Sequence, residues 1–244
     1  MHHLKSLIEY DGTHFNGWQI QPGRPSIQGT LTEAFEKIEG HPVTLHAAGR
    51  TDAGVHALGQ VIHCTVLKEL PPERWQAALN SRLPPDIRVR SVSRCAADFH
   101  ARLSARQKVY AYRFWKGRII SPFWHRYVVA VPTSINWEAM HMAAQSLVGT
   151  FDFTPFTVAD CEVHTHTRTI SDIAWRPLSD EVISLEFSGN GFLKYMVRRM
   201  VGLLMDVGTN RYPVSVVSDV LAGRSSPQIT TAPAKGLTLI RVDY

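Results

Sequence analysis

The sequence predicts an α+β protein made of two fused ferredoxin-like βαββαβ halves, residues 1–104 and 105–244. Two observations lead to this fold class. Strand-like and helix-like stretches follow one another in the order βαββαβ, and the second half repeats that order with one extra helix. We expect the halves to form a mostly antiparallel sheet with helices packed on it.

The first half is predicted to contain six elements. In chain order these are a strand at 4–10, a helix at 26–38, strands at 43–48 and 57–66, a helix at 73–81 and a strand at 87–93. Ser26 is the expected N-cap of the first helix, whose apolar residues recur at helical spacing until Gly40 ends it.

The second half is predicted from element order alone, because no repeat of the sequence itself is visible. The expected elements are a strand at 108–115, a helix at 137–148, strands at 169–176 and 182–187, helices at 192–207 and 213–221, and a strand at 237–242.

Composition narrows the class of protein. With 244 residues, 44% hydrophobic and 19% charged, the chain is an ordinary globular protein and not a disordered, collagen-like or coiled-coil one. Its three cysteines lie far apart, so we expect reduced thiols. No apolar run approaches the roughly 20 residues that span a bilayer, and no signal-peptide pattern is present, so we expect a cytoplasmic protein with no membrane partner.

Positive charge is concentrated in residues 82–126. This segment holds 11 basic and 2 acidic residues (+9), which leaves 15 basic and 19 acidic residues (−4) elsewhere. Aromatic residues are interleaved with the basic ones, as in proteins that bind single-stranded nucleic acid by stacking in a cationic groove. The alternative is a solvated basic surface.

The most unusual string is AGRTDAGVHA at 48–57, between two predicted strands. Its glycines allow a tight backbone that would project Arg50 and Asp52 from the sheet. In the alternative interpretation, Asp52 only caps a turn and Arg50 faces solvent. The predicted helix at 192–207 carries Arg198 and Arg199 among apolar residues, and a buried guanidinium needs a carboxylate partner. Asp52 is a candidate partner.

The chain resembles the TruA family of tRNA pseudouridine synthases along nearly its whole length. The matching strings, in the order of the family, are YDGTHFNGWQIQP with SIQGTLTEAF, GRTDAGVHALGQVIHC, KVYAYRF, DFTPF, GFLKYMVRRMVG and APAKGLTLIRVDY. The resemblance implies two fused ferredoxin-like halves around a basic cleft.

The resemblance also implies roles for individual residues. Asp52 matches the catalytic aspartate, and Tyr110 matches the tyrosine that stacks on the target uracil. Arg198 matches the arginine that pairs with the catalytic carboxylate, and Arg50 matches the arginine over the position that the flipped nucleotide leaves. The motif favours Arg198 over Arg199 for the pairing, but the sequence does not prove the register.

The implied reaction suits these residue types. Pseudouridine formation breaks the N1–C1′ bond of uridine and joins C5 to C1′, without redox change or added atoms, so neither metal nor cofactor is expected. Asp52 could attack C1′ or remove the 2′ proton, and it must be ionised for both. A flipped base needs an aromatic ring to receive it and a side chain to fill the gap.

Other residues have simpler interpretations. Cys161, His164 and His166 lie close together but fall short of the four ligands of a structural zinc site. We expect His56 to make a structural hydrogen bond and Trp18 to lie in the core.

The resemblance implies a homodimer that acts on tRNA, at uridines 38–40 of the anticodon stem-loop. Alternatives are a relative that acts on other uridines, a non-catalytic RNA-binding module, and a hydrolase with paired carboxylates. The RNA-binding module would be expected to carry an RNP1-type string, which is missing. The hydrolase would need a second acid near Asp52.

Binding of tRNA should weaken steeply as salt is raised, and charge reversals between Arg82 and Arg126 should flatten that dependence. Removal of one phosphate contact should change the slope of log K against log salt by about 0.7 to 0.9. Filter binding at several salt concentrations measures the slope. An unchanged slope after several reversals would mean that the basic segment is only a solvated face.

Overall fold

The computed structural model describes residues 1–158 and 164–244. The chain divides into two compact units, which we call unit 1 (Met1–Arg106 with Thr238–Tyr244) and unit 2 (Gln107–Leu237). The boundary near residue 105 resembles the sequence-based one. The last strand, however, which the sequence division left in the second half, is grouped with unit 1, because it pairs in parallel with a strand there.

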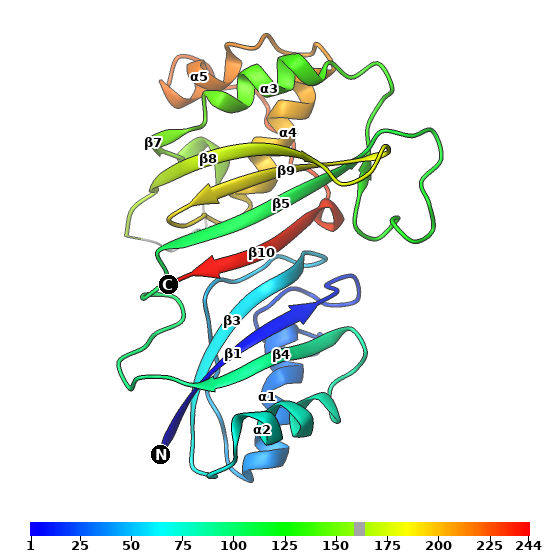
Figure 1. Ribbon diagram of the computed structural model, residues 1–244. Coiled ribbons are helices and arrows are strands. Elements are labelled where there is room, and N and C mark those ends of the chain that lie inside the picture. Colours follow the sequence, from blue (N-terminus) through cyan, green and yellow to red (C-terminus); the bar gives the residue numbers. More distant parts are fainter. Residues whose placement is uncertain (159–163) are drawn as a thin grey trace. The chain divides into compact units, whose positions relative to one another are not determined.

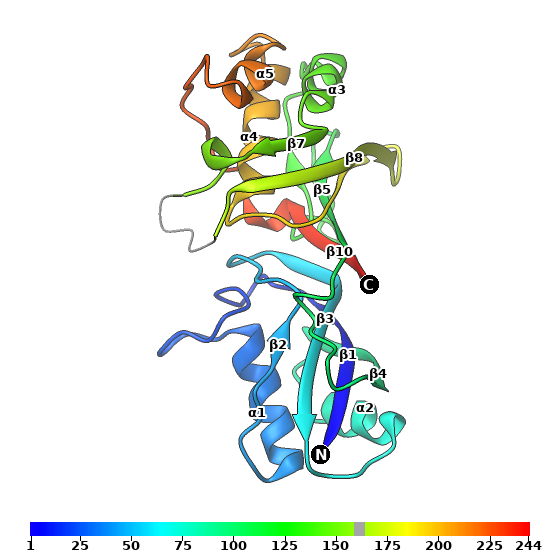
Figure 2. The ribbon, with the colours of Figure 1, turned by 90° about the vertical axis from the view of Figure 1, so that its left-hand side faces the viewer.

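Unit 1 has the ferredoxin-like strand order (Figure 1). Its elements are β1 (His2–Tyr10), α1 (Ile27–Glu39), β2 (His46–Ala47), β3 (His56–Val66), α2 (Pro72–Asn80), β4 (Ile87–Arg94) and most of β10 (Leu237–Asp243). The strands lie in the order β4-β1-β3, with β2 antiparallel to β3 and β10 parallel to it. Helix α1 lies behind these strands in Figure 1 and to their left in Figure 2.

Helix α1 is placed as the sequence predicts. The Ser26 side chain accepts a hydrogen bond from the Gly29 N–H, and Gly40 ends the helix in the left-handed region at φ 79°. Its apolar face is buried, with Phe35 stacked on Trp75 of α2 at 5.7 Å between ring centroids. Trp18 is only 2% exposed, which confirms its predicted place in the core.

Strand β2 is shorter than expected, two residues in place of the six predicted at 43–48. Side chains of α1 occupy the backbone groups that a longer strand would use. The Val43 N–H donates to Glu36 Oε1 at 3.2 Å, and the Leu45 carbonyl accepts from Gln28 Nε2 at 3.2 Å. These hydrogen bonds satisfy the Val43 N–H and the Leu45 carbonyl, so neither group needs a partner on a neighbouring strand.

Unit 2 is also α+β with an antiparallel sheet. Its elements are β5 (Gln107–Trp115), β6 (Val129–Ala130), α3 (Trp137–Gln145), β7 (Gly149–Asp152), η1 (Thr154–Phe156), β8 (Thr167–Pro177), β9 (Val182–Gly189), α4 (Met196–Gly208), α5 (Val216–Leu221) and η2 (Ala234–Gly236). The strands lie in the order β5-β9-β8-β7, all antiparallel, while β6 runs parallel to β5. The short strands β6 and β7 were not predicted.

Helix α4 begins at Met196, four residues later than predicted. Tyr195 has φ 60° and ψ −1°, in the left-handed region, and this conformation cannot continue a right-handed helix toward the N-terminus. Residues 191–193 therefore run as an irregular segment ahead of the helix.

Two of the three cysteines lie among the described residues. Cys64 and Cys95 are free, as expected, while Cys161 lies outside the described residues. Within the described part of the chain, no helix has both the length and the apolar character needed to cross a bilayer.

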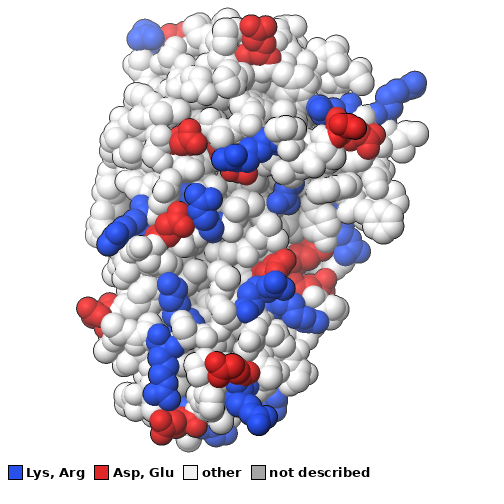
Figure 3. Space-filling view, in the orientation of Figure 1, with Lys and Arg blue, Asp and Glu red and all other residues white. Residues whose placement is uncertain are grey.

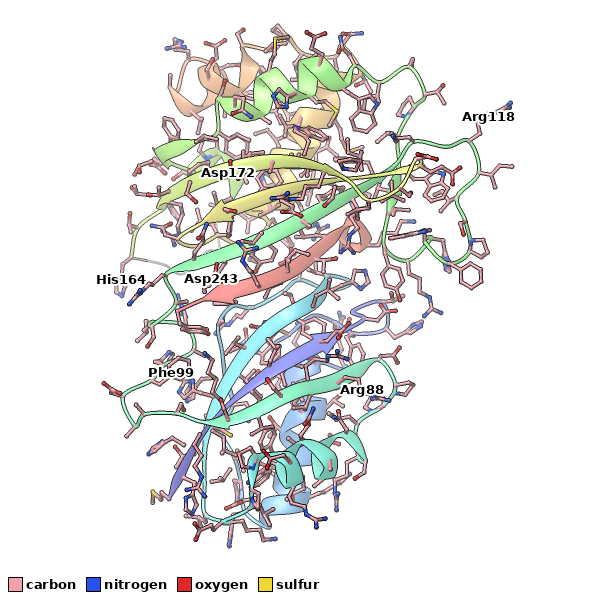
Figure 4. All side chains as sticks on the ribbon, viewed as in Figure 1. Arg88, Phe99, Arg118, His164, Asp172 and Asp243 are labelled. Carbon is pink, nitrogen blue, oxygen red and sulfur yellow. The ribbon has the colours of Figure 1, made fainter. Side chains whose placement is uncertain are left out.

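Three histidine rings gather on unit 1. His46 and His63 stack at 4.9 Å between centroids, and His100 lies 4.7 Å from His63. The Ala101 N–H donates to His63 Nδ1 at 3.1 Å, and the Phe99 ring, labelled in Figure 4, packs edge-on against His63. Burial, with the neighbouring His100, His46 and His3, lowers the pKa of His63 from 6.5 to about 4.

Unit 1 should therefore lose stability as the pH falls from about 6.5 toward 4. The folded pKa of His63 is the lower one, so the unfolded chain binds more protons in this window and unfolding is favoured. Urea unfolding at pH 7 and pH 5 measures the loss, which should shrink in His63→Gln. The exposed His41 provides the control, His41→Gln, which should behave as the parent does. Equal losses in parent and His63→Gln would contradict the prediction.

Candidate functional site

The loop that joins β2 to β3 in unit 1 carries Arg50 and Asp52. Arg50 is exposed, Asp52 is partly buried, and Thr51 between them is buried. Thr51 Oγ1 hydrogen-bonds the Tyr10 hydroxyl at 2.8 Å. The adjacent β3 adds a second anchor, since Gln60 Nε2 donates to the Gly49 carbonyl at 2.7 Å. The polar groups beneath the loop thus fix the backbone on either side of Arg50.

Burial keeps the anchor at Tyr10 neutral. Removal of the hydroxyl from water raises the pKa of Tyr10 to about 12, although its hydrogen bonds with Thr51 and Gln60 act in the opposite direction. Tyr10 therefore remains a phenol at physiological pH and keeps its hydrogen bond to Thr51.

The segment 11–18 packs against the backbone of the Asp52 loop. The Trp18 N–H donates to the Thr51 carbonyl at 2.9 Å, and the Gly54 N–H donates to the Phe15 carbonyl at 3.3 Å. A Cβ at Gly17, which has φ +85°, would lie 2.6 Å from the Thr51 oxygen, and one at Gly12 would lie 2.0 Å from the Val55 oxygen. Only glycine allows this approach, so the GxxxxG spacing of residues 12–17 serves the Asp52 loop.

His56 ties the segment 11–18 to the start of β3. It is 3% exposed, and its Nδ1 lies 3.1 Å from both the Gly12 N–H and Asp11 Oδ1. Nδ1 accepts from Gly12 when it carries no proton and donates to Asp11 when it does. In one state the imidazole holds Gly12 and in the other Asp11, so His56 is bonded to this segment in both, which agrees with the structural role expected for it.

Tyr110 lies on β5 of unit 2, opposite Phe187 of β9. Its ring is 7% exposed and meets the Phe192 ring edge-on at 5.1 Å between centroids. Phe192 belongs to the irregular segment that Tyr195 separates from α4. The late start of the helix thus places an aromatic ring against Tyr110.

Arg198 is anchored on the first turn of α4. Its Nε donates to the Ala232 carbonyl at 2.8 Å, and its guanidinium lies 5.2 Å from the centroid of the Tyr195 ring. The Ala232 N–H donates back to the Arg198 carbonyl at 3.0 Å. Tyr112 holds the next residue of this segment, through a 2.9 Å hydrogen bond to the Pro233 carbonyl. The APAKG string therefore directs the Arg198 side chain.

Arg199 is hydrogen-bonded to a different segment from Arg198. Its Nη2 donates to the Pro155 carbonyl at 3.2 Å, which ties α4 to η1 and so gives the DFTPF string a structural role. The two neighbouring arginines thus hold separate parts of unit 2. The pairing of Asp52 with Arg198 joins residues of different units, and it stays a prediction.

The supporting residues were not identified from the sequence. Tyr10, Thr51 and Gln60 form hydrogen bonds around the loop, although Tyr10 and Gln60 are 50 residues apart in the sequence. The one signal in the sequence was that all three fall inside the strings that carry the family resemblance.

No metal centre is formed by the part of the chain that the structure describes. Across residues 1–158 and 164–244, no three His, Cys, Asp or Glu side chains are arranged to hold a metal ion. Of the cluster noted in the sequence, Cys161 lies outside these ranges.

Comparison with known proteins identifies relatives over the whole chain. Curated proteins named tRNA pseudouridine synthase A from Limosilactobacillus reuteri (strain DSM 20016) and Shouchella clausii (strain KSM-K16) are 42% and 41% identical to it. Each match covers 100% of this chain, with 97% and 94% of the relative. Among solved structures, one of an H/ACA RNP bound to a substrate RNA containing 2′-deoxyuridine matches at 10% identity and TM-score 0.39, over 83% of this chain and 44% of that one, too weakly for any inference.

A family model described as tRNA pseudouridine synthase matches residues 7–103 and 143–244. The first stretch contains the Asp52 loop together with Tyr10 and Gln60, and the second contains Arg198 and its anchor at Ala232. On these matches and the full-length identity, the chain belongs to the tRNA pseudouridine synthase family.

Proposed function

We propose that this chain isomerises uridine to pseudouridine in tRNA, at positions 38–40 of the anticodon stem-loop. The observation that carries the proposal is the Asp52 loop, which the segment 11–18 and the pair Tyr10 and Gln60 fix from two sides, in a chain of this family. Catalytic carboxylates need this kind of support, because small displacements from reacting geometry cost large factors in rate.

Asp52 supplies the negative charge for the reaction. The N1–C1′ bond of the uridine breaks, the base turns, C5 bonds to C1′, and the proton on C5 leaves while N1 gains one. An ionised Asp52 serves as nucleophile on C1′ or as base toward the 2′ proton. All atoms and electrons of the uridine are conserved, so we propose that no metal and no cofactor takes part.

Three further residues have proposed roles at the target nucleotide. Arg50, exposed beside Asp52, fills the position that the flipped base leaves. Tyr110 stacks on the uracil. Arg198 pairs with the Asp52 carboxylate, and its bond to Ala232 and the Tyr195 ring set the direction of its guanidinium. These roles follow from the family resemblance.

The proposal includes the setting of the enzyme. We propose a homodimer in the cytoplasm whose two chains together hold one tRNA. The basic residues of segment 82–126 would contact phosphates, which position an RNA without reading its bases.

Pseudouridine mapping tests the substrate assignment. Unmodified tRNAs incubated with the protein should gain pseudouridine at positions 38 to 40 in several sequences, because phosphate contacts and stacking tolerate varied neighbouring bases. Sequencing after chemical derivatisation of pseudouridine reads the positions. New pseudouridines only in the T-loop would refute the choice of site and leave the chemistry intact, whereas none in any tRNA would refute the activity.

Asp52→Asn should abolish pseudouridine formation and leave tRNA affinity within a few-fold of the parent. The amide keeps the shape of the side chain but lacks the charge that either mechanism requires. Asp98→Asn, at an exposed acid of unit 1, is the matched control and should retain full activity. Appreciable turnover by purified Asp52→Asn would show that another group does the chemistry.

Arg198→Met should lower pseudouridine formation and move the acid limb of its pH–rate profile to higher pH. A guanidinium beside a carboxylate favours the ionised form, and its removal favours the protonated one. Arg199→Met is the matched control, which should lose stability through its contact with the Pro155 carbonyl while its acid limb stays in place. If the limb moves in Arg199→Met and not in Arg198→Met, the pairing belongs to Arg199.

A further inference from the structure

Tyr112 of β5 is a buried tyrosine of unit 2. It stands two positions after Tyr110, so the two side chains lie on the same face of the strand. Figure 3 shows, for one face of the protein, the charged side chains that a partner can reach, whereas Tyr112 is 0% exposed. A side chain without exposed surface does not touch an RNA, so Tyr112 can affect a reaction on RNA only through its neighbours.

Both ends of the Tyr112 side chain contact the segment that precedes β10. The hydroxyl donates to the Pro233 carbonyl at 2.9 Å, between residues 121 positions apart in the sequence. The ring lies against η2, since a Cβ at Gly236 would be 2.6 Å from Tyr112 Cζ. Tyr112 therefore fixes residues 233–236 through one hydrogen bond and one close packing contact.

The residue before this segment, Ala232, is bonded twice to Arg198. Its carbonyl accepts from Arg198 Nε at 2.8 Å, and its N–H donates to the Arg198 carbonyl at 3.0 Å. The Ala232 carbonyl belongs to the planar peptide unit that joins it to Pro233, whose ring fixes φ, here −54°. A displacement of Pro233 therefore moves the Ala232 carbonyl and turns the planar guanidinium bonded to it.

Tyr112 stays a hydrogen-bond donor at physiological pH. Burial raises the pKa of its hydroxyl above the ordinary value of 10, while the positive charge of Arg198 acts in the opposite direction. The hydroxyl therefore keeps its proton and its bond to the Pro233 carbonyl. Tyr112 supplies a fixed contact and takes no part in proton transfer.

We propose that Tyr112 is a positioning residue for pseudouridine formation, which directs the Arg198 guanidinium through Pro233 and Ala232. Strand β5 then serves the reaction twice, because Tyr110 stacks on the uracil and Tyr112, two residues later, sets the arginine. A merely structural tyrosine would affect stability alone. The inference rests on the role of Arg198 in the proposed function and adds the residue that orients its side chain.

Tyr112→Phe removes the hydroxyl and keeps the ring. Single-turnover pseudouridine formation should slow about tenfold while the Kd for tRNA stays within about twofold, because a turned guanidinium disturbs the reacting geometry and not the surface that binds RNA. Tyr244→Phe is the matched control, since it also loses a hydroxyl bond to a backbone carbonyl, that of Ala101 at 2.8 Å. It should lose comparable stability and react at the rate of the parent.

A double variant shows whether Tyr112 acts through Arg198. In the Arg198→Met background, Tyr112→Phe should slow the reaction no further, because the guanidinium that it directs is gone. Multiplicative effects of the two changes would overturn the proposal, and so would a folded Tyr112→Phe that reacts at the rate of the parent.

Nuclear magnetic resonance of the Arg198 Nε–H group gives a readout that needs no activity. With the signal assigned by its loss in Arg198→Met, Tyr112→Phe should shift it and speed its exchange with solvent, and Tyr244→Phe should do neither. An unchanged signal in Tyr112→Phe overturns the inference, whereas a shifted signal in a chain that modifies no tRNA refutes the proposed function instead. If circular dichroism shows that Tyr112→Phe does not fold, Gly236→Ala, which pushes η2 off the Tyr112 ring, takes the same tests.

Discussion

The close approach of two backbone segments determines how unit 1 holds the Asp52 loop. Residues 12–17 lie so near the Asp52 loop that a side chain at Gly12 or Gly17 would overlap carbonyl oxygens. An approach this close lets the Trp18 N–H reach the Thr51 carbonyl and leaves Asp52 on a backbone fixed from two sides. The YDGT and GRTDAG strings are thus one structural unit, although about 40 residues separate them.

In unit 2, a close backbone approach at a glycine also lies beside Arg198. A Cβ at Gly202 would lie 1.8 Å from the Thr230 carbonyl oxygen, so only glycine lets α4 contact the segment before Ala232. That contact brings the Ala232 carbonyl to Arg198 Nε. In both units, glycine allows two backbone segments to approach closely, next to Asp52 in unit 1 and next to Arg198 in unit 2.

Charge in the basic segment is less uniform than its sequence total suggests. On β4, Arg90 and Arg94 lie 3.4 Å from Glu9 and Glu69, and both pairs are exposed. Exposed pairs of this kind contribute little to stability, but they reduce the positive charge that this strand offers to an RNA. Arg82, Arg102 and Arg118 are exposed basic residues of the segment. The charge reversals that matter most for tRNA binding are therefore better chosen by structure than by position in the segment.

The sequence by itself determined the features that depend on neighbouring residues, namely helix ends and the order of the elements. The cap at Ser26, the stop at Gly40 and the order of strands and helices follow from periodicity and backbone preference. The motifs identified the family. Only the tertiary structure decided the rest. Gln28 and Glu36 shorten β2, Tyr195 delays α4, and Tyr10 and Gln60 support the Asp52 loop from strands distant in sequence. These outcomes depend on which backbone groups meet across the fold, and such meetings leave no periodic signal in a single chain.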